Sequence, residues 1–240
     1  MRLMSLMLTL SAVTGLAACG NGGEQKTVAP AEPAPPQTSQ NAQETAPPMA
    51  EAQGSGLQGG QADWRSVARA EDASALGRLD QAWRLARAEA EDAGFASQVE
   101  KLGPLVDPNA AQAGRVQPSP GEYRCRTIKL GNRNEGPGLA YVDYPWFSCS
   151  VALTPGGDLV LTKTTGSQRT QGLLYPEGDR RLVYVGAQAW GDDEKSFPRY
   201  GDKAERDQVG VLERIGQNRW RLAIPWPKQE AKLELLEIIR

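Results

Sequence analysis

Apolar residues between positions 63 and 102 recur at intervals of three and four, the spacing of one helix face. This pattern predicts an amphipathic helix that begins at an N-cap, Asp72, and ends at Ala93-Gly94. A second, short helix is expected in "FASQVEKLG", which stops at Gly103-Pro104. The apolar stripe of the first helix consists of Leu76, Leu79, Trp83, Ala86 and Ala90.

From "PSPGEY" onward the apolar period changes to two, which is typical of β-strands. Turn clusters such as "TPGGD", "PEGD" and "GQN" separate the strands, and such short connections require antiparallel neighbours. The predicted fold class is α+β, mainly β: an N-terminal helix pair, then about eight antiparallel strands in a closed barrel or a strongly bent meander sheet. The strands are expected near residues 121–130, 146–153, 158–164, 168–175, 181–188, 208–215, 218–224 and 231–238.

The alternation also assigns faces to the strands. In the strand at 218–224, Arg219 and Arg221 alternate with large apolar residues, so we expect both arginines on a solvated face. In the strand at 146–153, the residues expected on the buried side are Phe147, Cys149, Val151 and Leu153.

A polar stretch, "TTGSQRTQG" at 164–172, lies between two apolar strands. Its Gly166-Ser167 pair fits a two-residue type II′ turn, in which glycine supplies the positive φ, and Leu161 would then face Gly172. We interpret this stretch as a polar hairpin tip. A ligand site at Ser167, Gln168 and Arg169 is the alternative.

The first eighteen residues have a basic start, an apolar run and a small-residue exit, which together indicate an export signal. The exit "LAACG" resembles a bacterial lipobox and predicts lipidation of Cys19, with an incidental cysteine in a secreted protein as the alternative. Residues 19–61 are rich in Pro, Ala, Gln and Gly and predict a disordered tether. We therefore expect one folded domain, residues 62–240, attached through its lipid to the cell envelope. The glycine after Cys19 favours the outer membrane, facing the periplasm.

With Cys19 lipidated, Cys125 and Cys149 remain in an oxidising compartment and are expected to form a disulfide. The chain contains no histidine, which excludes Ser-His-Asp and Cys-His catalysis and imidazole-based zinc sites. Outside the signal and tether, 25 basic and 25 acidic residues remain after Arg2, Lys26 and four glutamates are removed from totals of 27 and 29. A balanced charge of this kind argues against a nucleic-acid partner.

The acidic loop "GDDEKSFPRYGDKAERD" could supply oxygen ligands to calcium, but its interleaved lysines and arginines favour a solvated loop of mixed charge. No phosphate-binding or dinucleotide-binding motif follows a predicted strand. The sequence thus predicts no metal, no cofactor and no catalytic residue.

At "GEYRCRTIKLG", "YPWFSC", "TGSQRTQGLLYP", "YVGAQAWG" and "ERIGQNRWRLAIPWP" the chain resembles an uncharacterised bacterial family, domain of unknown function 4893. The resemblance spans nearly all of residues 63–240, implies an exported protein of alphaproteobacterial type and brings no activity. It supports a possible binding role for Ser167, Gln168, Arg169, Arg206, Asp207 and Arg219. Further positions within the family pattern are Gly166, Tyr175, Glu213, Arg214 and Trp220.

A fainter similarity, through Tyr123-Arg124-Cys125 and Gly166-Ser167, concerns small periplasmic barrel lipoproteins that inhibit lysozyme. It serves only as an analogy.

Three functions follow as hypotheses. The preferred one is a lipid-anchored, non-catalytic binding module for a periplasmic protein, a glycan or another envelope component. The second is a carboxylate-dependent enzyme acting on an envelope polymer, which a pocket with two convergent carboxylates would favour. The third is a purely structural envelope protein.

Overall fold

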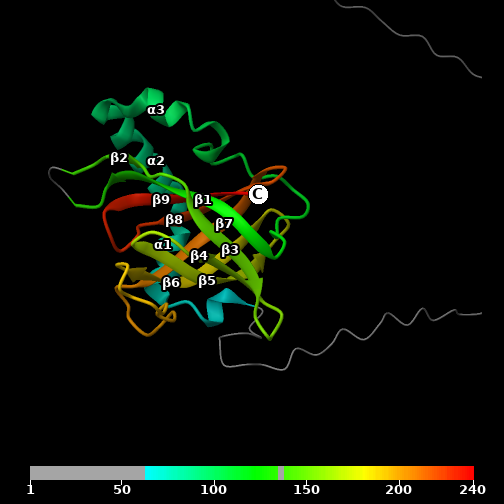
Figure 1. Ribbon diagram of the computed structural model, residues 1–240. Helices are drawn as coiled ribbons and strands as arrows, with labels where there is room; N and C mark the ends of the chain where they lie inside the picture. Colours follow the sequence, from blue (N-terminus) through cyan, green and yellow to red (C-terminus); the bar gives the residue numbers. More distant parts are fainter. Residues whose placement is uncertain (1–62, 135–137) are drawn as a thin grey trace, which may run out of the picture. The chain divides into compact units, whose positions relative to one another are not determined.

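The computed structural model describes residues 63–134 and 138–240, and it places a helical segment before a β-sheet (Figure 1). The predicted signal, Cys19 and the predicted tether lie outside the described residues. Glycine 94, at φ 92°, breaks the helical segment where the sequence places the end of the first helix. The helical elements are η1 (Trp64–Ser66), α1 (Ala70–Gly77), α2 (Leu79–Ala90), η2 (Glu91–Phe95), α3 (Ala96–Glu100) and η3 (Gly103–Leu105).

The expected N-cap is wrong, because α1 begins at Ala70 and Asp72 lies inside it. Asp72 is buried and accepts hydrogen bonds from the Tyr200 hydroxyl at 2.6 Å and the Lys228 ammonium at 3.0 Å. The carboxylate therefore ties α1 to two loops of the sheet instead of capping its own helix. None of the helices in the described part of the chain is long and apolar enough to cross a membrane.

The sheet confirms the predicted β region. Its strand order is β2-β1-β3-β4-β5-β6-β7-β8-β9, and an additional antiparallel pairing of β1 with β9 closes it into a barrel. Within the described residues, eight strands form this barrel and β2 is extra. The strands are β1 (Gly121–Asn132), β2 (Tyr141–Asp143), β3 (Phe147–Leu153), β4 (Leu159–Lys163), β5 (Gln168–Glu177), β6 (Arg181–Trp190), β7 (Asp207–Gly216), β8 (Arg219–Pro225) and β9 (Ala231–Ile239).

Strand β2 was not expected from the sequence, because three residues give no readable alternation. It forms because β1 is twelve residues long while β3 pairs only with its first part, from Gly121 to Cys125. The second part of β1 would otherwise expose unpaired backbone groups, and β2 pairs with Ile128, Lys129 and Leu130.

The disulfide between Cys125 and Cys149 is confirmed, with a Cα–Cα distance of 5.8 Å. It joins the neighbouring strands β1 and β3 inside the barrel, where both cysteines are fully buried. The apolar interior around it includes Val151, Leu161, Leu182, Leu212, Leu222 and Ile238. One expected member is wrong, because Leu153 at the end of β3 is 56% exposed.

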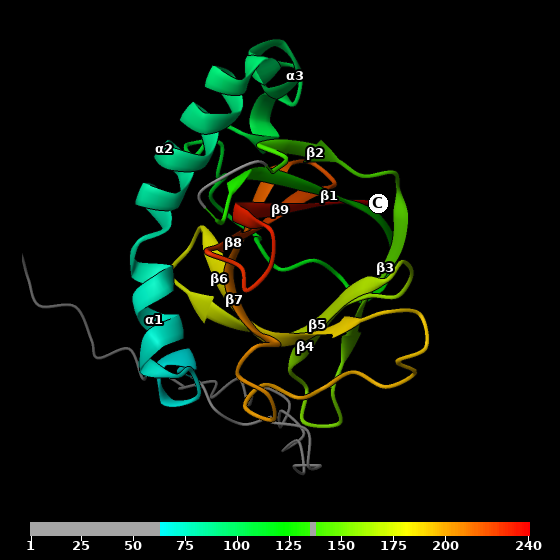
Figure 2. The ribbon, with the colours of Figure 1, turned by 90° about the vertical axis from the view of Figure 1, so that its left-hand side faces the viewer.

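Much of the outer wall of the barrel is buried as well. Helix α2 packs against β1, β8 and β9, while α1 packs against β7 and β8, so the helices form a column along one side of the barrel (Figure 2). Trp64 and Tyr200 cover a further patch on β5, β6 and β7. Burial on both faces explains the near-continuous apolar runs "LVYVGAQAW" and "LELLEII".

Arg221 corrects the expectation of a solvated arginine face. Its side chain is fully buried, and its guanidinium lies 4.8 Å from the ring centroid of Trp83 on α2. It forms an ion pair with Glu213 and donates hydrogen bonds to the backbone carbonyls of Leu105 at 3.1 Å and Asp107 at 2.7 Å. Arg221 thus docks the end of the helical segment on the barrel.

The predicted hairpin is correct in register and wrong in loop length. Leu161 pairs with Gly172 as expected. However, β4 ends at Lys163 and β5 begins at Gln168, so the connection covers residues 164–167 instead of two residues. Gly166 has φ 88°, and the Lys163 ammonium bridges the loop by donating to the carbonyls of Thr165 and Gln168.

Candidate functional site

One end of the barrel interior is polar, and we call this end the mouth. Chain segments 164–167, 191–206 and 226–230 connect strands there. Interior positions of the strands alternate with exterior ones, and toward the mouth the interior positions change from apolar to polar. The buried polar side chains on this half of the strands are Thr127, Lys129, Lys163, Thr170, Gln188, Gln208 and Glu234.

Tyr184 separates the apolar half of the interior from the mouth. A Cβ atom built on Gly172 would lie 2.5 Å from the Tyr184 ring, and one on Gly186 would lie 2.3 Å from the Tyr184 hydroxyl. Because both neighbours are glycine, the ring can lie across the strands and form a hydrogen bond between its hydroxyl and that of Thr170. Thr170 in turn donates to the Gln208 side-chain carbonyl at 2.7 Å. These three side chains form the floor of the mouth.

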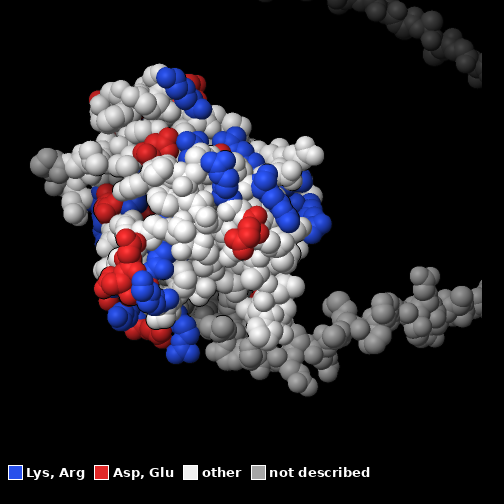
Figure 3. Space-filling model, in the orientation of Figure 1, with Lys and Arg blue, Asp and Glu red and all other residues white. Residues whose placement is uncertain are grey.

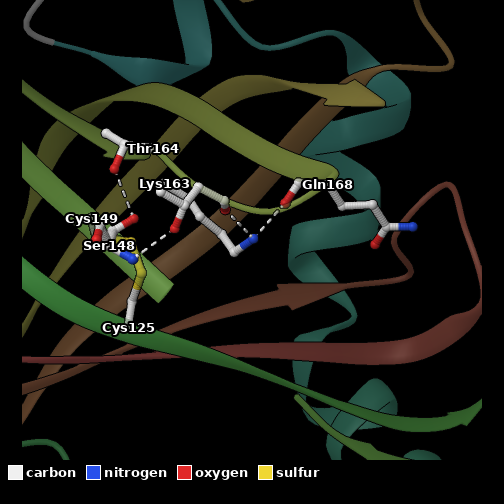
Figure 4. Close-up of a disulfide and its surroundings, with 7 residues drawn as sticks. Cys125, Ser148, Cys149, Lys163, Thr164 and Gln168 are labelled. Carbon is white, nitrogen blue, oxygen red and sulfur yellow. Dashed lines mark hydrogen bonds between the residues drawn. A yellow bond between two sulfur atoms is a disulfide. The ribbon is translucent and has the colours of Figure 1, made fainter. Parts of the chain in front are cut away.

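Lys163 stands beside the disulfide, because it pairs with Cys149 across β3 and β4. Its ammonium points along the loop toward Gln168 (Figure 4) and lies 3.9 Å from the ring centroid of Phe147. Burial lowers the pKa of Lys163 to about 8, and the charge of Glu234 opposes this shift only in part. The amine is therefore partly neutral in mildly alkaline solution.

Lys129 links the opposite side of the mouth to the rim. Its ammonium donates to the side-chain carbonyl of Gln168 at 2.6 Å and to Glu230 at 2.5 Å. Gln168 also donates to Glu230, at 3.2 Å. Burial by itself would raise the pKa of Glu230, but these hydrogen bonds outweigh it and the pKa is lowered.

Glu234 is the second carboxylate of the mouth. It projects inward from β9, is buried, and lies 4.0 Å from the Lys129 ammonium. Burial raises the pKa of Glu234, although the charges of Lys129 and Lys163 act in the opposite direction. The mouth thus holds two carboxylates whose pKa values move apart, an arrangement typical of functional sites.

These groups surround a cavity of about 210 Å³. Side chains from β1, β3, β4, β5 and β9 meet there with residues of the connecting segments. Its polar lining can both donate and accept hydrogen bonds, and its two rings supply apolar faces. The lining residues are Thr127, Tyr144, Phe147, Lys163, Ser167, Gln168, Glu230 and Glu234.

The raised pKa of Glu234 predicts a pH-dependent effect of Glu234→Gln on stability. Below pH 4.5, the pKa of a glutamate in the unfolded chain, the Glu234 carboxyl is protonated in both the folded and the unfolded state. Its ionisation then does not lower the free energy of unfolding of wild type. As pH rises through the folded-state pKa, the unfolded chain ionises first and the free energy of unfolding of wild type falls. The variant stays neutral, so its stability relative to wild type should increase with pH and then level off.

Urea unfolding of both proteins across this pH range measures the difference. Glu205→Gln, which changes an exposed acid in the segment before β7, controls for the loss of any carboxylate. A stability difference that grows toward acid pH would show that Glu234 is ionised favourably in the fold.

The structure brings two of the residues expected from the sequence into this site. Ser167 and Gln168 line the cavity, and Gln168 is bonded to both Lys129 and Glu230. The polar hairpin tip therefore also lines a hollow. From the sequence, a hairpin tip and a ligand site are alternatives, and the two descriptions apply to the same residues.

Arg169 and Arg206 lie elsewhere and hold the 191–206 segment. Arg169 donates to the backbone carbonyls of Gly191 and Glu194, and Arg206 forms an ion pair with Glu194 at 3.1 Å. The Arg206 guanidinium also stacks 3.7 Å from the ring centroid of Trp190. Both arginines are occupied by contacts within the fold.

Asp207 and Arg219 are separate again. Asp207 is buried at the start of β7, accepts a hydrogen bond from the Gly201 backbone at 2.9 Å and lies 3.2 Å from Arg69; burial raises its pKa. Arg219 forms an ion pair with Glu237 at 2.5 Å. These residues are not brought together with the mouth.

Sequence reasoning missed Lys129, Lys163, Glu230 and Glu234. Three of them could have been found from the strand alternation. Lys163 and Glu234 lie on the same faces of their strands as the apolar Leu161 and Leu236. Lys129 lies on the same face of its strand as Cys125. A charged residue on the apolar face of a predicted strand is rarely buried without a role. Glu230 lies in a loop and had no such signal.

Another hollow, of about 610 Å³, lies between α1 and the outer wall of β6 and β7. Its main polar groups, Arg65 and Glu177, already form an ion pair at 2.7 Å. Within residues 63–134 and 138–240, no cluster of three or more Cys, Asp or Glu side chains could hold a metal ion. The mouth is therefore the site with groups best placed to meet a ligand.

Comparison with known proteins identifies the family and adds no activity. No curated protein matches the chain. No solved structure matches it either. The family described as "Domain of unknown function (DUF4893)" matches residues 64–238, which include the helical segment, the barrel and the mouth. The chain belongs to this family of unknown function.

Proposed function

We propose that the protein is a lipid-anchored, non-catalytic binding module of the cell envelope, and that the mouth of its barrel binds the end group of a glycan. The observation that carries the proposal is the cavity of about 210 Å³ at the mouth of the closed barrel, which is lined by the buried Lys163 and Glu234 and by the half-exposed Glu230. Barrel mouths are common positions for ligand sites.

The lining favours a sugar because sugar hydroxyls both donate and accept hydrogen bonds. Glu230 and Glu234 offer acceptors, while Lys163 and Gln168 offer donors. The ring of Phe147 adds an apolar face against which a sugar ring can pack. Pockets for drug-sized ligands typically measure about 300 to 1,000 Å³. A hollow of about 210 Å³ therefore suits one sugar unit better than a polymer segment.

The anchor and the location are part of the proposal. They are supported by the export signal, the lipobox at Cys19 and the tether composition of residues 19–61, and the outer membrane facing the periplasm is the preferred site. Metabolic labelling with palmitate checks this point: label that Cys19→Ala abolishes supports the anchor, and a wild-type chain that takes up no label would argue for an ordinary secreted protein.

Titration calorimetry with N-acetylglucosamine, N-acetylmuramic acid and galacturonic acid tests the binding function. Two variants address the mouth: Glu234→Gln removes an acceptor, and Ser167→Tyr fills the rim from an exposed position. We expect one of these sugars to bind. Glu234→Gln should weaken it by roughly tenfold, the effect of losing one good hydrogen bond to a charged group, and Ser167→Tyr should weaken it at least as much by blocking the entrance. Glu205→Gln, far along the chain in an exposed segment, should bind as wild type does.

Binding that is unchanged in both mouth variants, or no binding of any of the three sugars, would overturn this proposal. Circular dichroism of each variant separates loss of binding from loss of folding.

A second candidate function, a carboxylate-dependent enzyme acting on an envelope glycan, is favoured by one observation. Glu230 and Glu234 line the same cavity with pKa values shifted in opposite directions, as a base and an acid would require. In that case Glu234→Gln would abolish release of sugar from a bound glycan while the variant still bound it.

A further inference from the structure

Three exposed arginines, Arg115, Arg124 and Arg240, lie close to the start of β1 and the end of β9. Arg124 lies beside Ile239 in the β1–β9 pairing, and Arg240 follows directly. The Arg240 guanidinium lies 5.5 Å from the ring centroid of Tyr123. Arg115 donates to Ser119, whose backbone carbonyl accepts from the Tyr123 hydroxyl at 2.6 Å. Arg240 thus packs on Tyr123, while Arg124 projects from the outer side of the same strand. We call Arg115, Arg124 and Arg240, together with Trp146, the arginine face.

The arginines of this face outnumber the acids beside it, among which the exposed Glu122 lies two residues from Arg124 on the same side of β1. Among the described residues, no carboxylate forms an ion pair with Arg115, Arg124 or Arg240. The nearby acids Asp143 and Glu237 are already paired, with Arg126 at 3.1 and 2.6 Å. Figure 3 shows basic side chains gathered over β1 and near the C-terminus, with smaller acidic patches beside them. Because the domain as a whole has equal numbers of acids and bases, this excess is local.

Apolar side chains accompany the arginines. Trp146 is 37% exposed, and the guanidiniums of Arg124 and Arg126 lie 5.0 and 5.1 Å from its ring centroid. Leu153, 56% exposed, lies two residues beyond Val151, which pairs with the first residue of β1. Arginine beside exposed tryptophan and leucine is the composition of surfaces that rest at a lipid–water boundary.

We propose that the arginine face docks the folded domain on an anionic phospholipid surface. The guanidiniums suit lipid phosphates, because each presents several donors in a plane. Trp146 and Leu153 suit the head-group region, where amphipathic and apolar side chains gain from partial burial. Three exposed arginines are too few to favour a nucleic acid, which would need a longer basic track with bases stacked on rings.

The arginine face lies toward the end of the barrel opposite the mouth, which determines how a docked domain would be oriented. Strand β9 runs from Ala231, next to the mouth, to Ile239 at the opposite end of the barrel, where Arg240 lies. Trp146 lies nearer the mouth, directly before Phe147, so a domain that rests mainly on the arginine end of this face leaves the mouth accessible. The inference does not depend on the glycan proposal, because it uses none of the mouth residues.

Vesicle sedimentation tests the docking, with residues 19–240 carrying Cys19→Ala so that neither the apolar export signal nor an acyl chain contributes. Vesicles of phosphatidylcholine are compared with vesicles that also contain phosphatidylglycerol. We expect binding only to the anionic vesicles, decreasing with salt. The variant Arg115→Glu/Arg124→Glu/Arg240→Glu should bind at least tenfold more weakly, given the contribution of each basic residue near an anionic leaflet.

A matched variant, Arg84→Glu/Arg180→Glu/Lys203→Glu, makes the same change in net charge at exposed positions away from this face and should bind as the parent chain does. Arg115→Gln/Arg124→Gln/Arg240→Gln, which removes charge without reversing it, guards against misfolding and should bind more weakly than the parent. The proposal is overturned if the parent chain ignores anionic vesicles, if both Glu variants lose binding equally, or if the parent binds soluble polyglutamate as well as it binds vesicles.

Discussion

Arg221→Ala is expected to lower the free energy of unfolding by about 3 to 5 kcal/mol, the usual cost of removing one partner of a buried ion pair. The variant leaves the Glu213 carboxylate without its guanidinium and the Leu105 carbonyl without that donor, while the Asp107 carbonyl keeps only its bond from the Ala110 backbone. It also removes the cation that packs on Trp83. The loss should appear in guanidinium unfolding followed by circular dichroism.

Arg181→Ala is the matched control, because its ion pair with Glu177 is long, at 3.7 Å, and half exposed. Such surface pairs contribute about 0 to 1 kcal/mol, so this variant should unfold close to wild type. If Arg221→Ala and Arg181→Ala cost the same, the buried arginine would have no special part in docking the helical segment.

Loss of the disulfide is expected to lower the free energy of unfolding by about 3 kcal/mol, because Cys125 and Cys149 close a loop with a sequence separation of 24. For a domain of this size, that corresponds to a fall in melting temperature of roughly 6 to 12 °C. The effect should be the same in wild type reduced with dithiothreitol and in Cys125→Ala/Cys149→Ala.

Cys19→Ala serves as the control, since it leaves this pair intact and should not change the melting temperature. Oxidised and reduced chains that unfold at the same denaturant concentration would show that the barrel closes without help from the cross-link. Equal stability of the oxidised and reduced chains would have a structural explanation, because the pairing of β1 with β9 also holds β1 in the barrel.

The strands were predictable because their signal is local. Alternation along "FSCSV" and "RWRLAI" places one apolar face in the interior whatever the rest of the chain does. The same reasoning failed for Arg221, which alternation assigns to the outside. The outer wall is covered there by α2 and η3, and a strand pattern contains no information about a helix packed from elsewhere in the sequence.

The candidate site was predictable only in part. Ser167 and Gln168 stood out as a polar hairpin, and both line the mouth. Lys129 and Glu234 come from β1 and β9, over a hundred residues apart in the chain, and their ammonium and carboxylate approach to 4.0 Å because β1 pairs with β9. No local pattern predicts that pairing, which closes the sheet between its most distant strands.

The sequence by itself determined the mainly β fold after a helix pair, the cysteine pairing and the absence of histidine chemistry, because each follows from local periodicity or from composition. Only the tertiary structure decided that the sheet closes, that Arg221 is buried, and that Lys163, Glu230 and Glu234 line one cavity. Those outcomes depend on contacts between segments far apart in the chain. The free energy that stabilises these features comes from side-chain burial and strand pairing in the folded state. Local sequence patterns do not reveal which distant segments will be buried or paired together.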